Sequence, residues 1–297
     1  MKLTPRKVQI REVGPRDGLQ NEATFLATEH KIAWINQLSQ TGLSYIEATS
    51  FVHPAWIPAL ADADQVMSGI DRVPGVAYAA LVPNIRGLQR ALAANVDEVA
   101  IFLSASESHS QKNINKSIEE TLEVLEETAT AALAAGKTVR GYVSTVFGCP
   151  YEGEVKLDAV LHVTEKLFEM GVREVSLGDT IGIAHPRQVA EVLDEMLKRY
   201  PAERLALHFH DTRGLAMANT LLALEMGIST FDSALGGLGG CPYAPGASGN
   251  LATDDLLFML DRLGMETGID QEKLRASARF LEEKWGRKLM SHQMQIC

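Results

Sequence analysis

The sequence predicts an α/β fold, a closed (β/α)8 TIM barrel with a small C-terminal helical addition. Short apolar segments alternate with longer helical patterns along the whole chain, with no linker between them. Glycines at 42, 136, 171 and 227 follow the ends of helical segments, where a C-cap belongs. A length of 297 residues suits one such barrel. The first predicted strand is not followed by GxGxxG, which counts against an open dinucleotide-binding sheet.

Eight segments are expected to be buried parallel strands, because they are short, apolar and rich in β-branched residues. They are Val8–Val13, Tyr45–Thr49, Val76–Val82, Glu98–Leu103, Val139–Val146, Glu174–Leu177, Leu205–His210 and Thr230–Leu235.

The clearest helical patterns lie between these strands and in the C-terminal tail. They are Thr28–Thr41, Ser117–Ala135, Leu157–Met170, Arg187–Arg199 and the amphipathic segment Gln271–Trp285. We therefore expect one catalytic domain over residues 1–297, with 264–297 as an extra helical segment.

Composition and charge narrow the class of protein. Apolar residues make up 46% of the chain, enough for a sizeable core, and the net charge of −10 argues against nucleic acid or an anionic membrane as the main partner. The three cysteines, Cys149, Cys241 and Cys297, are odd in number and widely spaced, which fits a reducing cytoplasm. We expect neither a signal peptide nor a membrane span.

In a TIM barrel the functional groups collect at the C-terminal ends of the strands. The first strand runs into a Gly/Pro turn that carries Arg16 and Asp17, a cation for an oxyanion and a hard oxygen ligand. The alternative is a helix-capping Asp17 paired with a surface Arg16. Glu47 lies inside the second strand and needs a partner, for which Arg16 is the obvious candidate. A purely structural Arg16–Glu47 salt bridge is the other interpretation.

The seventh strand carries the sharpest local pattern. His208 and His210 are two residues apart, so both imidazoles point to the same face of the strand. With a carboxylate such as Asp17 they would form a mixed nitrogen and oxygen site for a divalent ion. The alternative is a pair of hydrogen-bonded core histidines. Asp211 follows, in a position to orient one of the ligands.

Three further groups follow other strands. Asp179 and Thr180 come after the sixth strand between glycines, and Asp179 could instead cap a helix. Cys241 lies on a glycine-rich segment after the eighth strand, either poised over the site or an inert thiol. Asn250 offers an amide oxygen that can join a hard-ion shell or cap the next helix.

Together these segments resemble the hydroxymethylglutaryl-CoA lyases over nearly the whole chain. The most specific segment is GLGGCPYAPGASGN, which places Cys241 and Asn250 together. The other matching segments are Gly14–Asn21, Ile46–Phe51, Ser104–Asn115, Leu177–Gly182 and His208–Thr212. The Arg-Asp-Gly turn, Glu47 and the His-x-His pair alone would indicate only the wider group of barrel metallolyases, which includes isopropylmalate and homocitrate synthases.

The resemblance implies a metal centre and roles for individual residues. A divalent cation, Mg2+ or Mn2+, would be held by Asp17, His208, His210 and Asn250. Arg16 would stabilise the enolate of acetyl-CoA.

The remaining roles are also implied by the resemblance. Cys241 would act in proton transfer, and Glu47 and Asp179 would support the site, with Asp179 near the substrate hydroxyl. The general base would be His208 or Asp179. The substrate would also contact Gln20, Thr180 and Lys112, the last in the segment that lies near CoA in the family.

The implied reaction is the metal-assisted retro-Claisen cleavage of 3-hydroxy-3-methylglutaryl-CoA to acetyl-CoA and acetoacetate. We then expect an acyl-CoA substrate, a cytoplasmic homo-oligomer, specifically a dimer, and a place in leucine degradation and ketone body metabolism. The alternatives are a synthase that condenses acetyl-CoA with a 2-oxo acid, and a non-catalytic metal- or acyl-CoA-binding barrel.

Two stretches depart from many members of the family. Residues 232–237 read DSALGG, where many members have Ser-Val-Ala-Gly before Leu-Gly-Gly-Cys, and Arg213 and Leu215 stand where many have Tyr and Gln. We expect neither stretch to touch a proposed ligand.

Overall fold

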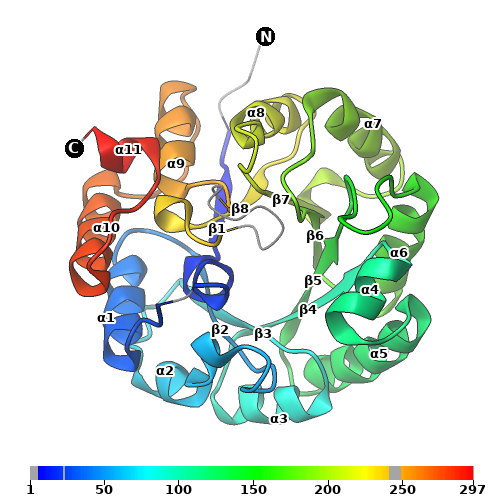
Figure 1. The fold of residues 1–297 in the computed structure, drawn as a ribbon, viewed down its shortest axis with the longest axis horizontal. Helices are drawn as coiled ribbons and strands as arrows, with labels where there is room; N and C mark the ends of the chain where they lie inside the picture. Colours follow the sequence, from blue (N-terminus) through cyan, green and yellow to red (C-terminus); the bar gives the residue numbers. More distant parts are fainter. Residues whose placement is uncertain (1–5, 23, 241–248, 297) are drawn as a thin grey trace.

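The computed structural model describes residues 6–22, 24–240 and 249–296, and these form a closed barrel of eight parallel strands inside a ring of helices (Figure 1). Each strand pairs with the next, and β8 pairs with β1 to close the barrel. The predicted TIM barrel is therefore confirmed. The strands are β1 (Gln9–Glu12), β2 (Tyr45–Ser50), β3 (Ala77–Leu81), β4 (Glu98–Ser104), β5 (Thr138–Ser144), β6 (Glu174–Asp179), β7 (Leu205–Phe209) and β8 (Thr230–Ser233).

The helices include all five that the sequence predicts. They are α1 (Thr28–Ser39), α2 (Ala63–Gly69), α3 (Ile85–Ala93), α4 (Glu107–Ile114), α5 (Ile118–Ala134), α6 (Leu157–Glu169), α7 (Pro186–Leu197), α8 (Ala216–Glu225), α9 (Thr253–Arg262), α10 (Gln271–Trp285) and α11 (His292–Gln295). Short helical turns cover Gly14–Gly18, Pro58–Leu60, Ala202–Arg204 and Leu235–Gly237.

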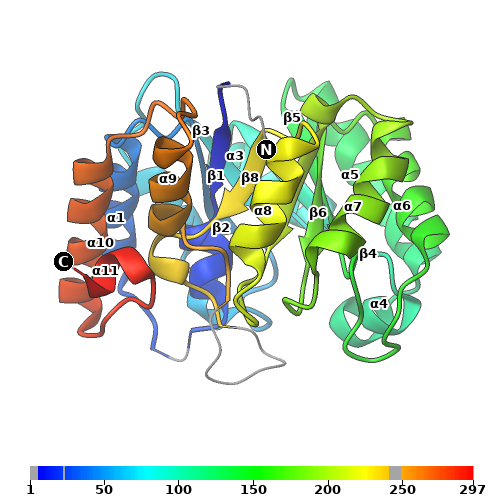
Figure 2. The same ribbon diagram turned by 90° about the horizontal axis from the view of Figure 1, so that it is seen from above.

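The C-terminal segment completes the helical ring. Helix α10 packs against α1 and α9, and α11 packs against α9, so the end of the chain closes onto its beginning (Figures 1 and 2). The division into one domain over 1–297 with 264–297 as an addition stays a prediction. Across the described ranges, no helix combines the length and apolar character needed to cross a membrane.

Two strand ends differ from the prediction in a way that affects the site. Strand β6 continues to Asp179, because Asp179 still pairs with Phe209 of β7, so this carboxylate ends the strand instead of following it. Strand β7 ends at Phe209, and His210 lies one residue beyond it in an isolated bridge with Asn250. The bridge brings the segment around Asn250 beside the histidine pair.

The barrel interior contains a chain of buried ion pairs. Arg140 of β5 is wholly buried; its Nε lies 2.7 Å from Glu174 of β6 and its Nη2 lies 2.6 Å from Asp232 of β8. Arg11 of β1 reaches the same Glu174 at 3.0 Å. Because a buried charge without a counter-charge costs several kcal/mol, each member depends on the next. The chain of pairs runs from Glu174, at the start of β6, through Arg140 and Asp232 to His208.

Glu12, at the end of β1, joins three segments outside the barrel interior. It is fully buried and accepts hydrogen bonds from the N–H groups of Gly14 at 2.9 Å and Leu235 at 3.0 Å, and from the hydroxyl of Thr253 at 2.6 Å. These partners belong to the turn after β1, the turn after β8 and the start of α9. Burial raises the pKa of Glu12 to about 7, although the three hydrogen bonds offset part of this effect.

Replacing Glu12 with glutamine should change how stability depends on pH. Between the ordinary pKa near 4.5 and the folded value of about 7, the folded chain keeps a proton that the unfolded chain has released. The free energy of unfolding of the wild type therefore falls as the pH rises through this window, by about 3 kcal/mol from this group. Urea unfolding at pH 4.5 and pH 8 should show that Glu12→Gln lacks this loss. An equal pH dependence in both proteins would contradict the assignment.

Candidate metal centre

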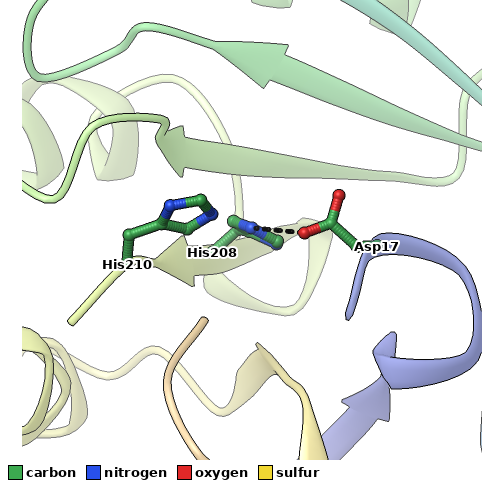
Figure 3. Close-up of side chains that lie close together, drawn as sticks. All are labelled: Asp17, His208 and His210. Atoms are coloured by element: carbon green, nitrogen blue, oxygen red, sulfur yellow. Dashed lines mark ion pairs between the residues drawn. The ribbon is translucent and has the colours of Figure 1, made fainter. Parts of the chain in front are cut away.

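Asp17, His208 and His210 come together at the C-terminal end of the barrel (Figure 3). Each offers one ligand atom, and these atoms all lie within 4.8 Å of one another. Asp17 comes from the turn after β1, His208 from β7 and His210 from the residue after β7. The two imidazole centroids are 5.3 Å apart, which agrees with the predicted common face of the strand. Side chains from two distant parts of the sequence therefore converge on one point.

The charge states of Asp17 and His210 suit a cation. Burial alone would raise the pKa of Asp17, but Arg16 and the two imidazoles lower it to about 2, so the carboxylate stays ionised. Burial, with help from His208, lowers the pKa of His210 to about 4, so this imidazole is neutral at pH 7. Ionised carboxylates and neutral imidazoles are the forms that bind metals.

Two buried atoms beside the cluster have no hydrogen-bond partner among the residues that the structure describes: Nδ1 of His210 and Oδ1 of Asn250. The Nδ2 group of Asn250 donates to Asp17 at 2.8 Å and to the carbonyl of Leu238 at 3.0 Å, so Asn250 is anchored to the cluster instead of capping α9. Unpartnered buried polar atoms are uncommon and costly. The donor set and the orphaned atoms fit a divalent cation.

Arg16 lies beside the cluster in a fixed position. Its Nε and Nη2 lie 2.9 Å and 2.8 Å from Oε2 of Glu47, and its Nη1 donates to Asp17. Tyr142 donates to the same oxygen of Glu47 at 3.0 Å, and Gln20 donates to Asp17 at 2.9 Å. Arg16 and Glu47 thus form the predicted pair. Gln20, predicted as a substrate contact, bonds to Asp17, and its contact with substrate stays a prediction. Burial opposes the charge of Arg16, but Glu47 and Asp17 raise its pKa, so the guanidinium stays charged.

The other predicted site residues occupy the ends of neighbouring strands. Asp179 accepts hydrogen bonds from the N–H groups of Ile183 at 2.9 Å and Ala184 at 3.1 Å, so it also holds the turn that follows β6. The hydroxyl of Thr180 accepts a hydrogen bond from the N–H of Thr145 at 2.8 Å.

The remaining predicted site residues are Lys112, Asp211 and Cys241. Lys112 is exposed on α4, the helix that follows β4. Asp211 accepts a hydrogen bond from the N–H of Ala216 at the start of α8. Cys241 and Cys297 lie outside the described residues, whereas Cys149 is a buried free thiol.

Sequence reasoning missed the carboxylate that contacts His208, which is Asp232. Its Oδ2 lies 3.3 Å from Nδ1 of His208. The expectation that the 232–237 stretch touches no proposed ligand is therefore wrong for Asp232. The readable signal is an ionisable residue in the middle of a predicted barrel strand, as at Glu47, and Asp232 pairs directly with His208 in the β7–β8 register. Sequence reasoning also missed Arg140, Tyr142 and Glu174, which are likewise ionisable residues inside predicted strands.

The chain is similar in sequence to known proteins over nearly its whole length. A family model described as HMGL-like matches residues 7–281. The chain is 58% identical to hydroxymethylglutaryl-CoA lyase YngG of Bacillus subtilis over 98% of both chains. It is 49% identical to the human mitochondrial hydroxymethylglutaryl-CoA lyase, over 98% of this chain and 90% of the relative.

Solved structures give the same result. The crystal structure of the Bacillus subtilis HMG-CoA lyase matches with a TM-score of 0.97 at 58% identity, over 98% of each chain. An HMG-CoA lyase from Acinetobacter baumannii, in complex with coenzyme A and 3-methylmalate, matches with a TM-score of 0.93 at 42% identity, over 97% of this chain and 94% of the other. Fold and sequence agree over almost the whole length, and the chain belongs to the HMGL-like family.

Proposed function

We propose that this protein is a carbon–carbon lyase that cleaves 3-hydroxy-3-methylglutaryl-CoA to acetyl-CoA and acetoacetate. The observation that carries the proposal is the cluster of Asp17, His208 and His210 beside the buried Arg16, in a chain 58% identical to a hydroxymethylglutaryl-CoA lyase. A cation site next to a fixed guanidinium can bind the oxygens of a hydroxy acid and stabilise an enolate. The cytoplasmic location, the dimer and the role in leucine degradation and ketone body metabolism stay predictions.

Asp17, His208 and His210 would hold the cation, Mg2+ or Mn2+, with Oδ1 of Asn250 as a fourth ligand. A bound divalent ion would polarise the hydroxyl and a carboxylate oxygen of the substrate. The supporting observation for Asn250 is that its amide oxygen is buried without a partner while its amide nitrogen already touches Asp17. A hard oxygen ligand suits both ions.

Arg16 would offset the negative charge that develops on the thioester oxygen when the carbon–carbon bond breaks. Glu47 grips the guanidinium through two nitrogens, and Tyr142 fixes Glu47 in turn. A donor held in this way needs no rearrangement as charge develops. Glu47 therefore orients Arg16, and Gln20 orients Asp17. Substrate contacts from Gln20, Thr180 and Lys112 stay part of the proposal.

Asp179 is the better of the two candidates for the general base. As a metal ligand, His208 would use one ring nitrogen on the cation, and its Nδ1 already faces Asp232. Asp17, with a pKa of about 2, is too weak a base. Burial raises the pKa of Asp179 to about 6, although the N–H groups of Ile183 and Ala184 offset part of this effect. A base works best when its pKa lies near the working pH.

The direct test is an assay with purified protein, Mg2+ and 3-hydroxy-3-methylglutaryl-CoA. Release of acetoacetate that stops when a chelator is added would support a metal-dependent lyase. Formation of free CoA thiol from acetyl-CoA and a 2-oxo acid, without acetoacetate release, would identify a synthase instead. Absence of both activities, with Mn2+ or acyl-CoA binding retained, would point to a binding protein.

Replacing His208 with alanine should abolish both cation binding and cleavage, because the cluster loses one of its three ligand atoms. Electron paramagnetic resonance of Mn2+ measures binding without relying on turnover. Circular dichroism serves as the folding control. Stoichiometric Mn2+ in His208→Ala would contradict ligation by this residue.

Replacing Asp179 with asparagine should lower kcat by about 10²–10⁴-fold while Mn2+ still binds, because general bases contribute about that much. A base must be ionised to accept a proton, so wild-type kcat/KM should rise with pH through about 6. Asp179→Asn should lose this limb of the profile. A variant with full activity and the same profile would rule Asp179 out.

Replacing Cys241 with serine should lower kcat by about 10²–10⁴-fold, because we propose that the thiol transfers a proton to the enolate carbon. Mn2+ affinity should be unchanged, since Cys241 is not a proposed ligand. Cys149→Ser is the matched control and should retain activity. An unchanged kcat in Cys241→Ser would remove the thiol from the mechanism.

A further inference from the structure

We propose that Asp232 is a positioning residue that decides which ring nitrogen of His208 is free to bind the cation. The inference rests on the proposed function, because it assumes that His208 is a ligand. Asp232 is wholly buried in β8 and touches neither Asp17 nor His210 at hydrogen-bond distance within the described part of the chain. It would act through His208 alone.

The geometry follows from the register of two neighbouring strands. Asp232 pairs with His208 across β7 and β8, and its Oδ2 lies 3.3 Å from Nδ1 of the imidazole. An ionised carboxylate only accepts hydrogen bonds, so Nδ1 must carry the proton. In the neutral imidazole Nε2 then keeps its lone pair. Nε2 is the nitrogen that faces Asp17, at 3.8 Å from Oδ2. The tautomer that Asp232 selects is the one that presents a ligand atom to the cluster.

Asp232 is itself held from behind by two donors, the guanidinium of Arg140 and the hydroxyl of Ser176. Arg140 donates to Oδ1 at 2.6 Å and to Oδ2 at 3.3 Å, and Ser176 donates to Oδ2 at 2.7 Å. Arg140 has no acceptor atom, so the carboxylate must present oxygens on both sides. Arg140, deep in the barrel, therefore fixes which groups in this hydrogen-bond chain donate and which accept. The chain ends at His208, where Nδ1 is the donor.

An asparagine at this position would change which groups donate and which accept, because one side of its amide is a donor. Its amide nitrogen must face either Arg140, where two donors would meet, or His208 and Ser176. Facing His208, the amide would donate to Nδ1 and place the imidazole proton on Nε2, where it blocks ligation. Carboxylates that orient metal-binding histidines are commonly worth about 10–100-fold in metal affinity.

The test compares Mn2+ binding in Asp232→Asn with a matched control, Glu174→Gln. Glu174 accepts from the same Arg140 at 2.7 Å, so both variants remove one buried negative charge from that guanidinium. Glu174 lies outside the cluster and pairs with Arg140 and Arg11. Electron paramagnetic resonance should show a Kd for Mn2+ raised about 10–100-fold in Asp232→Asn. Glu174→Gln should stay close to wild type.

The outcomes separate this inference from the proposed function. If the wild type binds Mn2+ and cleaves the thioester but Asp232→Asn binds Mn2+ equally well, the positioning role alone is wrong. If Glu174→Gln weakens Mn2+ binding as much as Asp232→Asn does, the effect comes from the charge balance of the barrel, and the role is again wrong. If the wild type itself binds no Mn2+, both proposals fail.

A measurement on the wild type covers the case in which Asp232→Asn does not fold. In Mg2+-loaded protein with 15N-labelled histidine, the ring signals of His208 can be identified by their absence in His208→Gln. The proposal requires a proton on Nδ1 and none on Nε2. A spectrum with the proton on Nε2 would overturn it.

Discussion

The pairing of Asp232 with Arg140 is the interaction on which the barrel interior and the metal centre both depend. Arg140 is wholly buried, and Asp232 is its closest counter-charge, at 2.6 Å. Burial would raise the pKa of Asp232, but Arg140 and His208 lower it below its usual range, so it remains ionised. The carboxylate of Asp232 therefore balances the buried charge of Arg140 and also contacts His208, a proposed metal ligand. The core cannot be repacked around Arg140 without disturbing His208.

This arrangement is costly for stability. An interior filled with branched apolar side chains is the common solution in TIM barrels. Exchanging buried ion pairs for apolar residues is often neutral or stabilising by about 1–4 kcal/mol. Here Arg11, Glu174, Arg140 and Asp232 form one connected set that ends at His208. The polar interior is best explained by the site above it, since Asp232, the last member of the set, contacts His208.

The sequence predicts the fold well because strand and helix patterns are local. All eight strands and the tail helix α10 follow from composition and periodicity. The histidine pair is also a local pattern, since alternation in a strand places His208 and His210 together. Asp232 and Arg140 are different: the two are far apart in the chain, and their contact depends on how the barrel closes. Likewise, nothing local shows that Asp179 still belongs to β6, because its pairing partner lies in β7.

The same reasoning applies to Asn250, which reaches the cluster by a route that no local pattern reveals. The segment around it runs beside the end of β7: the N–H of Asp211 donates to Gly249 at 2.7 Å, and the N–H of Leu251 donates to Phe209 at 3.0 Å. The position of the Asn250 amide beside Asp17 is thus determined by these backbone hydrogen bonds, which no property of the asparagine itself predicts. A cation held by Asp17, His208 and Asn250 would thus link the turn after β1 to strand β7 and to the segment that follows β8. We expect the loss of any of these contacts to disturb the site without unfolding the barrel. The eight strands are held together by their own backbone pairing, which does not involve these contacts.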